Sequence, residues 1–167
     1  EEDFHTIRML KDALAKLGDF EFSYMDNHST LIQKLLDNPP EFVLNLCDEG
    51  YNNDANLELH VPALLEMLGV PYSGGAPGSL ALCYDKAKVR AICASMDLPV
   101  PLETFYNPSD QAATLPSIFP ALLKPACGDS SIGITQDAVV HDADKLLDYM
   151  GYLRETLPGV PILIQEY

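Results

Sequence analysis

Basic residues are scarce in this chain. Lysine and arginine together number 10, whereas aspartate and glutamate number 25, so the formal net charge is −15. An acidic field of this strength repels nucleic acid and anionic membrane surfaces, and we therefore expect no nucleic-acid and no membrane partner. A small anionic ligand would need a local pair of cationic side chains, so the position of each lysine is informative.

The sequence also lacks long apolar runs and paired cysteines. No stretch approaches the roughly 20 apolar residues that cross a bilayer, and the opening residues EEDFH do not have a signal-peptide pattern. The cysteines form no Cys-x-x-Cys pair, which argues against a zinc site. We expect reduced thiols in a cytoplasmic protein at Cys47, Cys83, Cys93 and Cys127.

The first half of the chain alternates helix-type and strand-type patterns. Such alternation favours an α/β fold with a small parallel, Rossmann-like sheet. The series opens on a helix, so we expect a strand to precede it in the natural protein. The predicted elements are helices at 6–18, 29–38 and 57–69 and strands at 20–25, 41–47 and 70–75.

The second half has a different pattern, with more strands and longer loops. We expect a loop with one helical turn at 107–119, and the apolar strand at 160–167 to present an unpaired edge and to continue past Tyr167. The other predicted elements are a helix from Asp85 that stops before Pro99, strands at 102–106, 120–125 and 131–135, and a helix at 142–156.

Lys124 ends an apolar strand and is followed by the loop GDSSIG. Glycines at 128 and 133 permit unusual backbone angles, and the two serines between them supply hydroxyl and amide donors, so the loop could bind a phosphate. The Walker pattern GxxxxGK[ST] is absent. A plain strand–loop–strand, with a lysine that simply reaches solvent, is the alternative.

Two further polar residues stand at similar positions. Lys86 lies in the first turn of a helix, where it opposes the helix dipole but can also project toward a phosphate. Gln165 ends an apolar strand and offers both an acceptor and a donor. For each, an ordinary surface role is the alternative. The acidic loop with Asp48, Glu49 and Asp54 has no regular metal-ligand spacing, so we assign no metal ligand.

In this order, four stretches resemble the ATP-grasp ligases, and within them the D-alanine–D-alanine ligase group. The likeness covers almost the whole chain. The stretches are LLEMLGVPYSGG, ALCYDKAKVRAICASMDLPVP, FPALLKPACGDSSIGI and ILIQEY.

The resemblance implies an architecture and a set of roles. Residues 1–83 would be the α/β domain that precedes the grasp, and residues 84–167 the first α+β lobe, which ends at the adenine-binding hinge. The implied ATP contacts are Lys86 and Lys124 at the phosphates, Asp129, Ser130, Ser131 and Gly133 in the loop over them, Gln165 at the adenine amino group, and the backbone of Glu166 and Tyr167 as the hinge. Ser130 would also help to organise the substrate, a catalytic role.

The same resemblance implies the chemistry of the parent protein. It would be a Mg-ATP-dependent carboxylate–amine ligase that joins two D-alanines through an acyl phosphate for peptidoglycan synthesis. The first strand and the second lobe, which holds the Mg²⁺ ligands, are absent from this sequence, so we expect the chain alone to be inactive. Expected partners are ATP and a small amino acid, and a homodimer stays open.

Departures from the family pattern leave alternatives open. The loop reads Gly128-Asp129 where the family has the acid first, and CDEG replaces the usual His-Gly near the first substrate. A glutamine at 165 in place of the usual glutamate predicts weaker discrimination of ATP from GTP. Another ATP-grasp ligase with a different amino-acid or peptide substrate, or a non-catalytic α/β binding module, remains an alternative.

Overall fold

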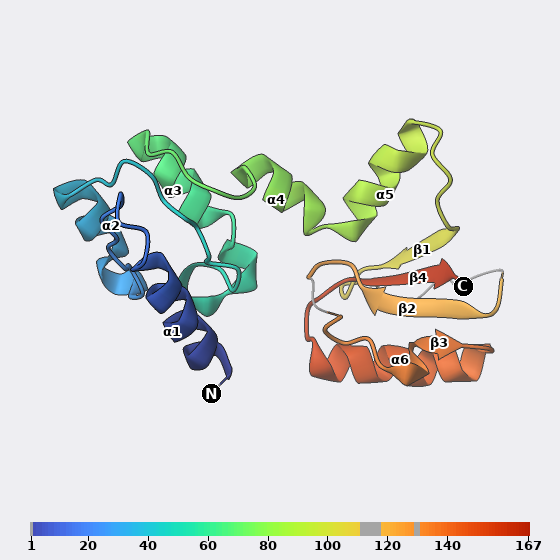
Figure 1. Cartoon of the computed structure of the whole chain (residues 1–167). Helices are drawn as coiled ribbons and strands as arrows, with labels where there is room; N and C mark the ends of the chain where they lie inside the picture. Colours follow the sequence, from blue (N-terminus) through green and yellow to red (C-terminus); the bar gives the residue numbers. More distant parts are fainter. Residues whose placement is uncertain (1, 111–117, 129–130) are drawn as a thin grey trace. The chain divides into compact units, whose positions relative to one another are not determined.

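The structure is a computed structural model that describes residues 2–110, 118–128 and 131–167. The chain divides into two compact units, residues 1–41 and 42–167, and each is described by itself. Figure 1 labels the helices and strands along the chain.

The first unit contains two helices, α1 (Glu2–Leu14) and α2 (His28–Asp37). Asn27 caps α2, and its side-chain oxygen accepts a hydrogen bond from the Ser29 amide at 3.0 Å. The two predicted helices are therefore present. The predicted strand at 20–25 is not formed, because a strand needs a hydrogen-bonded neighbour and no described segment pairs with it.

The second unit begins with a region that is mostly helical. Its elements are two short 3₁₀ turns (Tyr51–Asn53 and Ala55–Leu57), α3 (His60–Leu68), α4 (Pro77–Cys83) and α5 (Lys86–Ser95). Gly69 ends α3 in the left-handed conformation with a φ of 68°, as the sequence pattern predicts. Helix α4 was not predicted.

The parallel sheet expected in the first half is not confirmed. Between the segments predicted as strands 41–47 and 70–75, the described residues form a single parallel bridge, which joins Val43 to Tyr72. Its hydrogen bonds run from the Val43 amide to Pro71 and from the Ser73 amide to the Val43 carbonyl, at 2.8 and 2.9 Å. A sheet grows beyond one bridge only when further strands pair on either side.

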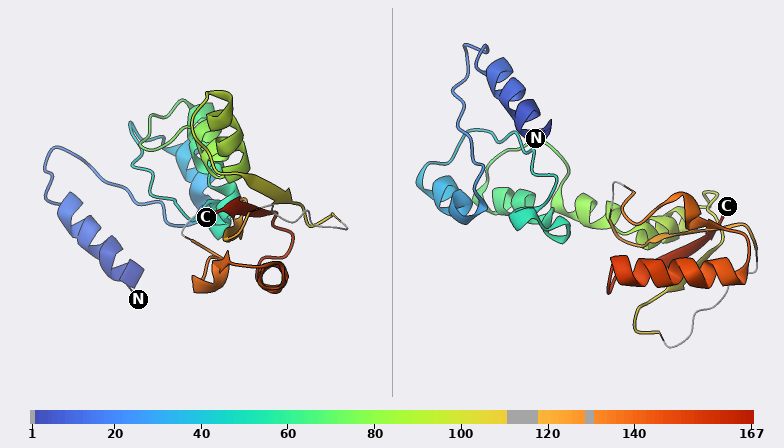
Figure 2. Two further views of the ribbon diagram at one scale, coloured as in Figure 1. Left: turned by 90° about the vertical axis from the view of Figure 1, so that its right-hand side faces the viewer. Right: turned by 90° about the horizontal axis from the view of Figure 1, so that it is seen from below.

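The rest of the second unit is an antiparallel sheet with one long helix, α6 (Ala143–Thr156). The strand order is β1-β4-β2-β3, and α6 lies against one face of the sheet (Figures 1 and 2). The strands are β1 (Glu103–Tyr106), β2 (Ala121–Pro125), β3 (Val139–Val140) and β4 (Ile162–Glu166).

The core lies between this sheet and α6. Leu123, Ile164 and Leu146 are each at most 1% exposed, and they belong to one cluster of buried side chains. Burial of each such side chain contributes about 1.5–3 kcal/mol to stability. Because side chains alternate along a strand, the neighbours of these core residues, Lys124 and Gln165, project from the opposite face. The face away from α6 therefore carries Lys124 and Gln165 beside the buried side chain of Leu163.

Two expectations for this half are wrong. The segment 131–135 is a turn, because Ser131 and Gly133 have φ values of 58° and 74°, which a strand cannot accommodate. Strand β3 instead pairs with β2 on the side away from β4. The strand at the end of the chain is not an edge. Residues of β4 pair with β1 on one side and with β2 on the other.

Candidate nucleotide site

Lys86 is the first residue of α5, and the residue before it sets the start of the helix. Asp85 accepts a hydrogen bond from the Lys88 amide at 3.0 Å and pairs with the Lys88 ammonium at 2.9 Å. Burial raises the pKa of Asp85, but these contacts with Lys88 outweigh it, so the pKa lies below its ordinary value. The Asp85 cap therefore stays ionised and fixes the start of α5 at Lys86.

Lys86 is also tied to the segment that follows β2. Its amide donates to the Ala126 carbonyl at 2.9 Å, the Gly128 amide donates to Tyr84 at 3.3 Å, and an antiparallel bridge joins Asp85 to Cys127. The Lys86 ammonium in addition donates to the carbonyl of Gly128. The start of the helix and the start of the glycine-rich loop are thus held side by side.

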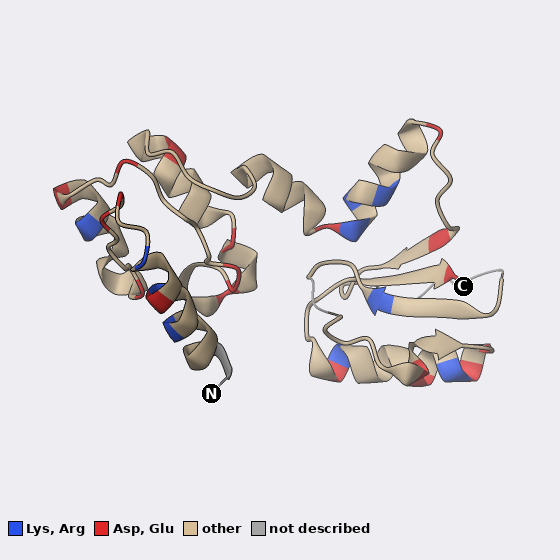
Figure 3. Ribbon diagram, viewed as in Figure 1, with Lys and Arg blue, Asp and Glu red and all other residues tan. Residues whose placement is uncertain are grey.

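Lys124 approaches the same place from the sheet. It lies on β2, one residue after buried Leu123, on the face that α6 does not cover. Within the described residues the Lys124 ammonium has neither a hydrogen bond nor an ion pair, so its charge is available to an anion. Figure 3 shows how few basic positions the second unit has and that they include the start of α5 and the end of β2.

A hollow of about 310 Å³ brings the predicted residues together. Lys86, Lys124 and Gln165 all line it, although they come from three elements that are far apart in the sequence. Its walls combine apolar and polar groups, as small-molecule sites generally do. The other lining residues are Cys83, Val89, Arg90, Cys93, Val100 and Pro101.

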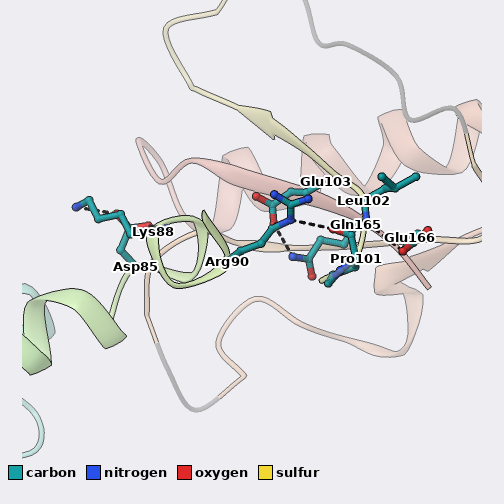
Figure 4. A network of polar contacts seen from close by, with 8 residues as sticks. All are labelled: Asp85, Lys88, Arg90, Pro101, Leu102, Glu103, Gln165 and Glu166. Atoms are coloured by element: carbon teal, nitrogen blue, oxygen red, sulfur yellow. Dashed lines mark hydrogen bonds and ion pairs between the residues drawn. The ribbon is translucent and has the colours of Figure 1, made fainter. Parts of the chain in front are cut away.

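Gln165 belongs to a polar network that sequence reasoning missed. Its side-chain nitrogen donates to Oε2 of Glu103, its cross-strand partner on β1 (Figure 4). Arg90 of α5 places its Nε 3.9 Å from the same oxygen and donates to the Pro101 carbonyl at 2.8 Å. The Glu103 side chain is only 8% exposed, so these two partners take the place of water around its carboxylate oxygens.

The glycine-rich loop is partly described. Asp129 and Ser130, two of the predicted ATP contacts, lie outside the described residues. Gly133 faces α6: the Tyr149 hydroxyl donates to its carbonyl at 2.8 Å and accepts from the Thr135 amide at 2.9 Å. The Ser131 carbonyl accepts from the Ile134 amide at 3.0 Å. The end of the loop is therefore attached to α6, and neither Ser131 nor Gly133 lines the hollow.

The predicted hinge residues follow Gln165: Glu166 is the last residue of β4, and Tyr167 comes directly after the strand. The amides of Glu166 and Tyr167 already donate to the carbonyls of Leu102 and Pro120, at 3.0 and 3.1 Å. The Glu166 carboxylate accepts from the Leu102 amide at 3.0 Å. In this arrangement the two amides are not available to a base, and Glu166 serves to hold the start of β1.

The four cysteines and the acidic loop at residues 47–54 also carry side chains of reactive or metal-binding types. All four cysteines are free, and Cys127 lies beside the Asp85 cap. Burial, with the Asp85 charge, raises the pKa of the Cys127 thiol. In the part of the chain that the structure describes, no three metal-type side chains lie close enough to hold an ion, and this includes Asp48, Glu49 and Asp54.

Comparison with known proteins finds relatives among the D-alanine–D-alanine ligases. No family model matches the chain. The D-alanine–D-alanine ligase of Aquifex aeolicus is 30% identical over 169 residues, which span this whole chain and 54% of the relative. That of Gloeobacter violaceus is 28% identical, over 96% of this chain and 51% of the relative. The chain thus spans about half the length of the curated relatives it matches.

The solved structures agree with this likeness. The D-alanine–D-alanine ligase from Bacillus anthracis, in a crystal complexed with ATP, superposes with a TM-score of 0.62 at 25% identity and covers 86% of this chain and 45% of its own. The sequence likeness and the superposition support an ATP-grasp protein. Within that superfamily, the chain is D-alanine–D-alanine ligase-like.

Proposed function

We propose that this chain is the ATP-binding part of a Mg-ATP-dependent carboxylate–amine ligase, most similar to those that join two D-alanines. The observation that carries the proposal is the single hollow lined by Lys86, Lys124 and Gln165. Residues 84–167 would then be the first lobe of the grasp, and residues 1–83 the domain before it. In a chain with a net charge of −15, two lysines in one hollow mark a place for an anion.

We assign roles to three residues of the hollow. Lys86 and Lys124 offset the negative charge of the phosphates, and an ammonium–phosphate hydrogen bond contributes about 1.5–3 kcal/mol. The oxygen of Gln165 accepts from the adenine amino group. The backbone of Glu166 and Tyr167 would contribute to the adenine edge through carbonyl groups, since their amides donate elsewhere.

Ser130, with Asp129, Ser131 and Gly133, would form the loop over the phosphates. Lysines and loop amides act on such a reaction by stabilising charge on the phosphoryl group, without forming a covalent bond to it. The hydrogen bond from the Tyr149 hydroxyl to the Gly133 carbonyl attaches the end of this loop to α6.

Magnesium would come with the nucleotide. When bound, the ion would supply Lewis-acid stabilisation of the charge on the transferring phosphoryl group. Among the described residues no three metal-type side chains lie close enough together to hold the ion. We expect the chain to release no phosphate from ATP when it is assayed alone.

The acid and the amine are the least defined part of the proposal. The family likeness favours D-alanine for both, and the product would serve peptidoglycan synthesis. The sequence CDEG at residues 47–50, in place of the family's His-Gly, is the specific observation that favours a different amino acid or peptide. Gly50 holds this loop in a shape that only glycine allows, because a Cβ there would lie 2.0 Å from the Asp54 carbonyl oxygen.

The proposal also includes a cytoplasmic location, the ligands and a possible homodimer. The four free cysteines suit the reducing cytoplasm. None of the described helices is long and apolar enough to cross a bilayer. ATP and a small amino acid would be the ligands, and a homodimer would have to form through surfaces other than the edge of β4, which is paired on both sides.

Two assays test the proposal. Titration of the chain with Mg-ATP should move the NMR signals of residues around the hollow, whereas a non-catalytic module without a nucleotide site would show no such change. The longest natural polypeptide that contains this sequence should then release phosphate from ATP with D-alanine. A panel of other amino acids distinguishes a D-alanine ligase from an enzyme with another substrate.

A further inference from the structure

Gln165 stands where the ligase family usually has a glutamate, and its neighbour changes what that substitution means. A free glutamine side chain can present either its oxygen or its nitrogen to a ligand, because rotation by 180° exchanges the two. The structure restricts this choice. Gln165 is 7% exposed, and its carboxamide contacts the Glu103 carboxylate.

The orientation follows from the chemistry of the pair. An ionised carboxylate can only accept hydrogen bonds, so the group of Gln165 that contacts Glu103 must be its nitrogen. Figure 4 shows the carboxamide nitrogen directed at Glu103 and the oxygen on the other side. Reversal would bring two oxygens together in a largely buried place, which is unfavourable.

The Glu103 carboxylate is itself held in place. It lies opposite Gln165 in the β1–β4 register, so the two backbones fix the distance between the side chains. Arg90 approaches it from α5 and is fixed in turn by its hydrogen bond to the Pro101 carbonyl. The result is a chain of contacts from α5 through β1 to the polar end of β4.

We infer that Glu103 is a positioning residue for base recognition, and that it makes Gln165 a hydrogen-bond acceptor. The inference rests on the proposed nucleotide site. An acceptor at this place pairs with the amino group of adenine and repels the carbonyl oxygen that guanine carries at the same position. The pair Glu103–Gln165 therefore selects ATP over GTP, and the weak discrimination expected from a glutamine alone does not apply.

The test compares Kd values for Mg-ATP and Mg-GTP by NMR titration of the full 167-residue chain. The wild type should bind ATP more tightly. Glu103→Gln keeps the size of the side chain but offers Gln165 both a donor and an acceptor, so the ratio Kd(GTP)/Kd(ATP) should fall about three- to tenfold, the effect of one hydrogen bond. Glu155→Gln, which removes an exposed carboxylate from α6, should leave the ratio unchanged.

A second pair of variants isolates the route of the effect. In a Gln165→Leu background, Glu103→Gln should not change the ratio further, since Glu103 acts only through Gln165. A fall in the ratio of similar size in that background would show that Glu103 acts on the nucleotide by another route, which contradicts the inference.

Hydrogen exchange of the Gln165 side chain in the wild type tests the inference even if the Glu103→Gln variant does not fold. In the wild type, the side-chain amide protons of Gln165 should exchange with water more slowly than those of exposed Gln136. Equally fast exchange would overturn the inference.

The outcomes separate this inference from the proposed function. Equal ratios in wild type and Glu103→Gln, with ATP bound, contradict the role of Glu103 and leave the nucleotide site intact. A wild-type chain that binds neither nucleotide at millimolar concentration contradicts the site itself, and with it the role of Glu103.

Discussion

The ammonium of Lys86 donates a hydrogen bond to the carbonyl of Gly128, which joins the first turn of α5 to the start of the glycine-rich loop. Lys124 enters the same hollow from β2 and has no partner within the described residues. The two lysines therefore differ in the apo state. Lys86 would have to exchange a backbone carbonyl for a phosphate oxygen, whereas Lys124 only has to be desolvated.

Replacement of Lys124 tests its assignment to the phosphates. Lys124→Ala should weaken ATP binding about 10- to 100-fold, since a charge-assisted hydrogen bond contributes about 1.5–3 kcal/mol. Lys145→Ala is the matched control, because it removes a lysine that is 69% exposed on α6. An equal loss of affinity in both variants would mean that net charge, and no specific contact, governs binding.

The loop end at Gly133 should be sensitive to a single methyl group. A Cβ at this position would lie 2.7 Å from Leu157 and 3.1 Å from Leu153, at a φ of +74°. Gly133→Ala should therefore lower the free energy of unfolding by about 1–3 kcal/mol, measured in urea.

A second glycine, on α6, provides the control for that measurement. A Cβ on Gly151 would point into open space, with no described atom beyond the backbone of its own helix within 4 Å. Gly151→Ala should therefore stabilise the helix by about 0.5–1 kcal/mol. If both substitutions changed stability in the same direction, the contact of Gly133 with α6 would not be the cause.

The Asp85 cap should make stability depend on pH. Although burial raises its pKa, the contacts with Lys88 lower it overall, so the folded state favours the ionised form. Ionised Asp85 therefore stabilises the folded state at pH values above the pKa of aspartate in the unfolded chain, near 4. This stabilisation is lost as the pH falls through the lower pKa that Asp85 has in the folded state. The benefit is below about 1 kcal/mol because the pair is partly solvated.

Unfolding of wild type and Asp85→Asn in urea checks this expectation. Asparagine caps helices about as well as aspartate, so the comparison isolates the charge. Wild type should be the more stable protein at neutral pH, and the difference should disappear well below pH ~4. A difference that is constant across this range would exclude the ionic contribution.

Cysteine alkylation reports on the hollow without an activity assay. Cys83 is exposed and lines the hollow, so bound ATP should slow its reaction with iodoacetamide. Cys47 and Cys127 should react slowly with or without nucleotide, because burial raises the pKa of both thiols and lowers their thiolate fraction. Undiminished alkylation of Cys83 at saturating ATP would contradict binding in this hollow.

Local features of the structure could be predicted from the sequence, and features that depend on pairing could not. The helix starts at Asp85 and Asp142 and the helix end at Gly69 match the predicted bounds, since each depends on neighbouring residues. The predicted strand at 131–135 was wrong. Its apolar alternation is outweighed by two left-handed residues that form a turn.

In the candidate site, too, some residues could be predicted from the sequence and others could not. The family resemblance implied that Lys86, Lys124 and Gln165 contact one nucleotide, and all three residues line one hollow. Glu103 was missed, because its role depends on the register between β1 and β4, which the sequence does not reveal. The sequence contains a weak indication that Arg90 belongs to the site, because Arg90 lies four residues after Lys86 and hence on the same face of the helix.

The central claim is that the hollow between α5 and the sheet holds ATP, and titration of the labelled 167-residue chain with Mg-ATP tests it most directly. The largest changes in amide chemical shift should fall around Lys86, Lys124 and Gln165, with small ones around α1 and α2. Lys124→Ala should shift the titration to higher ATP concentration. Changes that are absent at millimolar ATP, or that fall elsewhere and persist in Lys124→Ala, would contradict the account.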